Sequence, residues 1–273
     1  MCELFAMSAN ASVRVRYDLD RFAAEGGETH QNRDGWGIVI SEGSDAHYFR
    51  EAEPASNSPL DRFVREHATP HEIMIAHVRR ASRGNRLLAN THPFRRVHRG
   101  KVQHFAHNGT LTGIDDLSSA QRLIPHRVGE TDSELSFLVL LDRLEEVGGA
   151  CPDVTAKFDV FRRFCHDMTK LGTANFLWLD GSNLFVHADR RMRETERGLT
   201  PPQPPGLHML SPEPDALGNS HHCTGAHLED VPSHIVLFAS LPLSDGPWEP
   251  MEQGSVIAVK EGKVIHHGSS IRP

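Results

Sequence analysis

Short apolar stretches separated by turn residues dominate the first 110 residues of the chain. Several of these stretches alternate apolar and polar positions, and this period of two is typical of strands. Gly, Asn and Asp residues lie between them, as is usual for turns. The pattern predicts strands at residues 2–9, 35–41, 47–51, 73–81 and 101–106, with a short helix at 60–67 after Pro59.

The middle of the chain changes to helical spacing. The run Thr131-Asp132-Ser133-Glu134 fits a capping box, and we expect it to begin an apolar helix that ends at Gly148-Gly149. A second helix is predicted over about 153–171, because phenylalanines recur there on one side. The two helices therefore follow one another after the first group of strands.

Strands return after the helices, and the pattern places them at 176–179, 184–187, 234–241, 255–260 and 263–267. The proline-rich stretch 198–233 has few apolar pairs, so we interpret it as a loose surface excursion. The order of strands, helices and strands predicts an α+β fold with mostly antiparallel sheets. The length fits one large domain or two small ones, and we expect a single domain over residues 1–273.

Composition excludes several broad classes of protein. The chain has 36 acidic and 29 basic residues and a formal charge of −7, whereas nucleic-acid binding normally needs a basic excess. No apolar run approaches the roughly 18–20 residues that a membrane span requires. The N-terminus lacks a cationic leader, and four irregularly spaced cysteines favour free thiols, so we expect a cytoplasmic protein.

Cys2 is the first residue that indicates chemistry. Removal of the initiator methionine would give Cys2 a free α-amine, which titrates near about 7.7–8.0 and can act as a base at neutral pH. The thiol of the same residue is a strong nucleophile once it is ionised. Alternatively, Cys2 is simply a small residue at the start of a strand.

Three later motifs carry polar groups that could contact a substrate. Asn108 and Gly109 follow a predicted strand and could supply two donors to an oxyanion, or could form an ordinary turn. Arg79 lies near a strand end and could bind a carboxylate, or could be a surface cation. Asp132 could accept hydrogen bonds from a substrate ammonium, or could complement a helix dipole.

The order of these motifs along the chain, with Asp34-Gly35-Trp36-Gly37 between Cys2 and Arg79, resembles that of the class II glutamine amidotransferases. This family belongs to the N-terminal-nucleophile hydrolases. Residues 1–10, 90–94 and 129–134 look most like its stand-alone, YafJ-like branch. The resemblance implies a four-layer αββα sandwich of two mostly antiparallel sheets.

The resemblance also implies a role for each candidate residue. Cys2 would be the nucleophile and its amine the base, while Asn108 and Gly109 would donate to the oxyanion. Arg79 would bind the α-carboxylate of glutamine and Asp132 its α-ammonium. The substrate would be glutamine or a γ-glutamyl compound, no cofactor or metal would be needed, and ammonia would pass to a separate synthase subunit.

Other interpretations of the sequence remain. The run Arg79-Arg80-Ala81-Ser82-Arg83-Gly84 replaces the Arg-Trp-Ala-Thr-His-Gly of the large synthases, which puts the loop that closes on glutamine in question. The protein could instead hydrolyse a γ-glutamyl conjugate or another small amide, or be a non-catalytic regulatory or ammonia-channelling subunit. The 19 histidines suggest metal binding, but their densest groups, at 221–223 and 266–267, lack zinc-site spacing.

Overall fold

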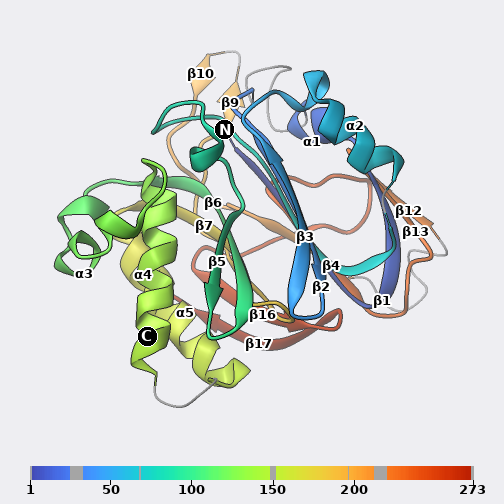
Figure 1. The fold of residues 1–273 in the computed structure, drawn as a ribbon. Helices are drawn as coiled ribbons and strands as arrows, with labels where there is room; N and C mark the ends of the chain where they lie inside the picture. The colour runs from blue at the N-terminus through green and yellow to red at the C-terminus, as the bar shows by residue number, and fades with distance from the viewer. Residues whose placement is uncertain are drawn as a thin grey trace.

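The computed structural model of the protein describes residues 2–24, 33–67, 69–147, 152–195, 197–211 and 220–271. Two antiparallel sheets face one another, and helices cover the outer face of each sheet (Figure 1). Within the described residues no helix is long and apolar enough to cross a membrane. The predicted α+β class and the four-layer αββα sandwich are confirmed.

The first sheet is built around the N-terminal strand. Its order is β15-β11-β14-β1-β4-β2-β3, and β12 and β13 extend it alongside the second half of β1. Its strands are β1 (Glu3–Tyr17), β2 (Trp36–Glu42), β3 (Asp45–Glu51), β4 (His71–Val78), β11 (His208–Leu210), β12 (Ser220–Cys223), β13 (Ala226–Glu229), β14 (Ile235–Ala239) and β15 (Glu249–Pro250). The start of β1 therefore lies between β4 and β14, in the centre of the sheet.

The second sheet has the order β17-β16-β8-β7-β6-β5. Its strands are β5 (Phe94–His98), β6 (Lys101–Leu111), β7 (Gly172–Leu179), β8 (Leu184–His187), β16 (Ser255–Lys260) and β17 (Lys263–Ser269). A small separate hairpin consists of β9 (Glu194–Thr195) and β10 (Gly198–Leu199), and Figure 1 shows it beside the N-terminus. The strands predicted at 176–179 and 184–187 are confirmed as parts of β7 and β8, which pair as an antiparallel hairpin.

The helices form the two outer layers. They are α1 (Leu19–Ala24), α2 (Pro59–Glu66), α3 (Ser118–Gln121), α4 (Asp132–Glu146) and α5 (Val154–Thr169), with 3₁₀ turns η1 (Ala55–Asn57), η2 (Leu88–Asn90), η3 (Ile114–Asp116) and η4 (Ile124–His126). One apolar core packs α1 and α2 on the first sheet, and another packs α4 and α5 on the second. A third core, which includes Leu4, Ala6, Ala106 and Leu177, fills the space between the sheets.

The structure corrects two expectations about strand positions. The stretch 198–233 is not only a surface excursion, because β11, β12 and β13 belong to the first sheet and bury Leu210, Cys223 and Leu228. The motif Asn108-Gly109 lies inside β6 rather than after it, since β6 continues to Leu111. Strands β11 and β13 and the end of β6 pair with strands distant in the sequence, and the local sequence carries no sign of this pairing.

The capping box at the start of α4 is half formed. Thr131 caps the helix, because its hydroxyl accepts a hydrogen bond from the Glu134 N–H at 3.1 Å. The Glu134 carboxylate does not return to the cap residue, as a full box requires. It accepts hydrogen bonds from the N–H groups of Val128 and Gly129, at 2.9 and 2.7 Å, and pairs with Arg96. The predicted helix end at Gly148-Gly149 lies outside the described residues.

Candidate active site

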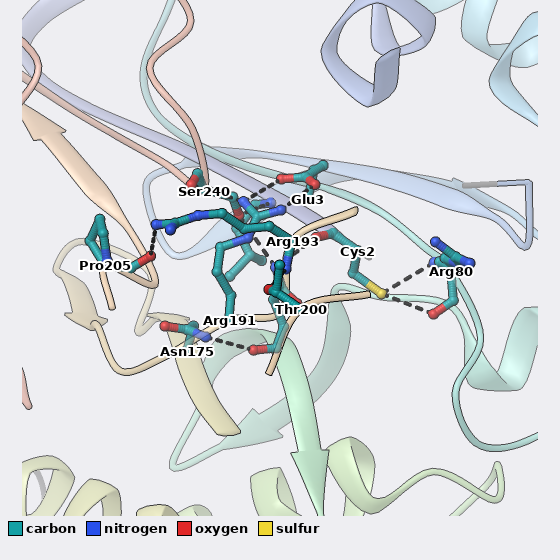
Figure 2. A network of polar contacts seen from close by, with 11 residues as sticks. Cys2, Glu3, Arg80, Asn175, Arg191, Arg193, Thr200, Pro205 and Ser240 are labelled. Atoms are coloured by element: carbon teal, nitrogen blue, oxygen red, sulfur yellow. Dashed lines mark hydrogen bonds and ion pairs between the residues drawn. The ribbon is translucent and has the colours of Figure 1, made fainter. Parts of the chain in front are cut away.

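Cys2 directly precedes β1 at the end of the sandwich where the chain begins (Figure 1). Side chains alternate along a strand, so Cys2 shares the inter-sheet face with Leu4 and Ala6. Its Sγ accepts a hydrogen bond from the Arg80 N–H and donates one to the Arg80 carbonyl, both at 3.2 Å (Figure 2). Burial raises the pKa of the thiol, while the Arg80 N–H and the charge of Arg79 act in the opposite direction.

The side chain of Asn108 reaches Cys2 from the second sheet. Its Nδ2 donates to the Cys2 carbonyl at 2.6 Å and lies 3.4 Å from the Ser240 hydroxyl oxygen. The main-chain carbonyl of Asn108 accepts a hydrogen bond from Asn175 Nδ2 at 2.9 Å. The side-chain amide of Asn108 thus lies against the backbone of the candidate nucleophile, while its main chain is bonded to a side chain of β7.

Gly109 has a clear packing reason to lack a side chain. A Cβ at this position would lie 1.9 Å from the Thr173 carbonyl oxygen and 2.6 Å from His107 Nε2. Only glycine permits β6 and β7 to approach this closely. Of the predicted pair, Asn108 therefore contacts the N-terminus, and Gly109 lies where β6 packs tightly against β7.

The Arg79 guanidinium lies among main-chain carbonyls. It follows β4 and donates to the carbonyls of Asp34, Arg83, Gly84 and Asn85 at 3.0–3.3 Å. Burial lowers the pKa of Arg79, while Cys2 and Asp34 act against this shift. Arg79 is 2% exposed and forms no ion pair with a carboxylate within the described residues. Its charge is therefore buried without an ion-pair contact, although the Asp34 carboxylate is close enough to act on its pKa.

Asp132 is the corresponding buried anion. It begins α4 and is 3% exposed, and its Oδ2 accepts a hydrogen bond from the Leu111 N–H at 2.6 Å. No lysine or arginine of the described chain forms an ion pair with it. The next residue, Ser133, lies 2.8 Å from His107 Nδ1, so α4 is joined to β6 one residue before Asn108. Asp132 and Arg79 therefore lie on separate elements and do not neutralise each other.

The sequence analysis missed a group of residues that surround the start of β1. Figure 2 shows Glu3, Arg191 and Ser240 in one polar network with the Cys2 backbone nearby. The Glu3 carboxylate pairs with Arg191 at 2.7 and 3.0 Å, and Arg191 also donates to the Ser240 carbonyl at 2.9 Å. From the sequence alone Glu3 and Arg191 look like ordinary exposed charges, because the two residues are 188 positions apart.

The histidine-rich stretches do not form a metal centre in the described part of the chain. No group of three or more His, Cys, Asp or Glu side chains is arranged there to hold a metal ion. Burial lowers the pKa of several histidines in the core. For example, burial lowers the pKa of His77 to about 3, and its ring lies 4.3 Å from that of His92.

Comparison with known proteins shows the family of the chain. The family model of the class-II glutamine amidotransferases matches residues 1–273. YafJ of Escherichia coli K12, a candidate glutamine amidotransferase, is 34% identical over 193 residues, which cover 70% of this chain and 74% of YafJ. A crystal structure of a predicted glutamine amidotransferase from Pseudomonas aeruginosa PA01 has a TM-score of 0.70 at 27% identity, covering 97% of this chain and 100% of that one.

A more distant structure supports the fold alone. Glutamine phosphoribosylpyrophosphate amidotransferase from Bacillus subtilis aligns with 100% of this chain and 50% of its own, with a TM-score of 0.60 and 14% identity. That structure and this chain therefore share their fold. The chain belongs to the class II glutamine amidotransferases, the enzymes that hydrolyse the side-chain amide of glutamine.

Proposed function

We propose that the protein hydrolyses glutamine through a thioester on Cys2 and releases ammonia. The observation that carries this proposal is a pair of buried charges, Arg79, which acts on the Cys2 thiol, and Asp132 at the start of α4. Arg79 and Asp132 have only neutral hydrogen-bond partners in the described chain, and buried charges are normally paired. An amino-acid head group would bring one carboxylate and one ammonium, so it would pair with both.

The proposed reaction uses each contact in the site. The Cys2 thiolate attacks the side-chain carbonyl carbon of glutamine and forms a tetrahedral oxyanion. Asn108 Nδ2 carries two hydrogens, one bonded to the Cys2 carbonyl, whereas the other makes only a 3.4 Å contact to Ser240. We assign that second hydrogen and the Gly109 N–H to the oxyanion, because donors aimed at developing charge lower the barrier.

The proton transfers are assigned to the α-amine of Cys2. The amine takes the thiol proton and returns it to the leaving nitrogen, so that the C–N bond breaks and ammonia departs. Water then adds to the γ-glutamyl thioester, and glutamate leaves with regeneration of the thiol. This assignment requires removal of Met1, which lies outside the described residues.

Two extensions of the proposal concern the group attached to the γ-amide of the substrate and the acceptor of the ammonia. The charges of Arg79 and Asp132 do not select what is attached to the γ-amide, so hydrolysis of a γ-glutamyl conjugate is the second candidate function. The ammonia acceptor is proposed to be a separate synthase subunit.

The test combines intact-mass analysis with an ammonia-release assay. We expect a mature N-terminus at Cys2, activity on L-glutamine, and complete loss of activity in Cys2→Ala. Cys223→Ala is the matched control, because that thiol is buried in β12 and burial raises its pKa to about 12. Activity in Cys2→Ala, or in protein that retains Met1, would contradict the mechanism.

Recognition of the head group is tested with a second substrate. Butyramide has a primary amide but neither α-charge, so Arg79→Met and Asp132→Asn should weaken its hydrolysis little. For glutamine each variant should lower kcat/KM by about 30-fold or more, since an unpaired buried charge costs about 2–5 kcal/mol. A wild-type preference for butyramide would contradict the glutamine assignment. Comparison of glutamine with γ-glutamyl-p-nitroanilide decides between the two candidate functions.

A further inference from the structure

The residue that follows the candidate nucleophile belongs to a buried ion pair. Both Glu3 and Arg191 are 1% exposed, and their two hydrogen bonds, at 2.7 and 3.0 Å, align the carboxylate with the guanidinium (Figure 2). Burying such a pair gives little or no net stability relative to well-packed apolar residues, because both ions lose their hydration. Stability alone therefore does not explain why these charges occur here.

The pair extends into a network that holds the first residues of β1 in place. Arg191 Nη1 also donates to the Ser240 carbonyl at 2.9 Å, and Leu4 and Ser240 exchange two hydrogen bonds of 3.0 Å. Arg191 is itself fixed through its backbone, which exchanges two 3.0 Å hydrogen bonds with Gln203. Through Arg191 the ion pair thus connects Glu3, the residue after Cys2, to Ser240 and to Gln203.

Cys2 needs such an anchor because sheet pairing stops before it. The pairing of β1 with β4 begins at Glu3, and the pairing with β14 begins only at Phe5. Chain ends beyond the last paired residue are normally poorly ordered. A reactive group displaced by about 1 Å can lose about 100-fold in rate, so a terminal nucleophile demands a fixed position.

We infer that the Glu3–Arg191 ion pair is a positioning device that holds Cys2 in line with Asn108 and the bound substrate. The inference rests on the proposed function, in which Cys2 is the nucleophile. Neither Glu3 nor Arg191 takes part in the bond changes. Their role is to fix the backbone of residues 3 and 4, and through it the thiol and amine of Cys2.

The test replaces both charges at once with uncharged side chains of similar size. In Glu3→Gln/Arg191→Met no buried charge is left without a partner, so we expect urea unfolding close to that of the wild type. The turnover number for glutamine should fall about 10–100-fold with little change in KM, because Arg79 and Asp132 remain. A merely structural pair would leave the turnover number unchanged.

A second buried ion pair provides the matched control. Lys157 and Asp180 lie 2.6 Å apart where β7 ends, away from the Asn108–Asn175 pairing of β6 and β7. The variant Lys157→Met/Asp180→Asn removes the same kind of interaction, and its turnover number should equal that of the wild type. An equal loss of turnover in both double variants would overturn the inference.

Covalent labelling separates this inference from the proposed function. The glutamine analogue 6-diazo-5-oxo-L-norleucine should label Cys2 of the wild type, and the Glu3→Gln/Arg191→Met variant at least about 10-fold more slowly. Iodoacetamide, which needs no aligned head group, should label both proteins at similar rates. If the wild type neither releases ammonia nor reacts with the analogue, the proposed function fails. A double variant that reacts with the analogue as fast as the wild type overturns the positioning role.

Conservative variants cover the case in which the double variant does not fold. Glu3→Asp keeps the charge but shortens the side chain by one methylene, and Arg191→Lys keeps the charge but loses the two-pronged geometry. Each should lower the turnover number about 5–10-fold while the urea midpoint changes little. Unchanged turnover in both folded variants would overturn the inference as well.

Discussion

Acid should destabilise this protein through its buried histidines, and His104 allows this to be measured at one site. His104 lies on β6 at 1% exposure, its ring is 5.5 Å from that of Tyr48, and its ring nitrogens have no hydrogen-bond partner in the described chain. Burial, assisted by the charge of Arg95 on the neighbouring strand, lowers its pKa to about 3. The native state therefore keeps His104 neutral throughout the pH range in which an unfolded histidine gains a proton.

The size of the effect follows from the two pKa values of His104. In the unfolded chain the pKa is about 6.5, so the contribution to stability is complete above that pH and is lost as the pH falls towards 3. At pH 5 the difference of 1.5 pH units corresponds to about 2 kcal/mol. In His104→Phe, whose ring can take the same place beside Tyr48, this part of the acid loss should disappear.

The assay is urea unfolding, followed by tryptophan fluorescence, at pH 7.5 and pH 5.0 and constant ionic strength. The wild type should lose about 2 kcal/mol more than His104→Phe between these pH values. His126→Gln serves as the control, because His126 is exposed and should not alter the acid loss. Equal acid losses in the wild type and His104→Phe would refute the reasoning, because His104 would then titrate normally in the folded protein.

Three further predictions concern the site and the outer layer. Asn108→Ala should lower the turnover number for glutamine about 10²–10³-fold and change KM little, as measured by steady-state ammonia release, because the lost donor acts only on the oxyanion. Gly109→Ala should destabilise the protein by about 3 kcal/mol in urea unfolding, since its Cβ would lie 1.9 Å from the Thr173 carbonyl oxygen. Asp61→Asn should raise stability by about 2 kcal/mol at pH 8 but not at pH 4, because burial raises the pKa of Asp61 to about 6 and ionisation therefore weakens the fold as the pH rises. Urea midpoints at the two pH values check this last result.

The sequence predicts well those helices and strands that depend on residues close together in the chain. The helices at 132–146 and 154–169 and the hairpin between β7 and β8 follow the predicted positions closely. The N-terminal strand is longer than predicted and continues to Tyr17. Residues 10–12 interrupt its alternation, and the structure has a register shift between Ser8 and Val13 at this point.

Elements that depend on distant partners could not be predicted in this way. Strand β11 has only three residues, and its strand conformation comes from pairing with β14 and β15. Among the site residues, Cys2, Arg79 and Asp132 occur in recognisable motifs. By contrast, the pairing of Glu3 with Arg191 is a purely tertiary contact between two ordinary charged residues.

The central position of β1 also has a consequence for the order in which the protein can fold. All five residues assigned to the reaction occur by Asp132, yet the strand that begins beside Cys2 pairs Phe5 with Ala239 and Ala6 with Phe238. Pairings this distant in sequence form slowly, because a very long loop must close first. On the ribosome β1 can pair with β4 early, but its pairing with β14 must wait until residues 235–239 have been synthesised. The candidate site around Cys2 thus gains its complete sheet only after most of the residues assigned to the reaction have been in place for some time.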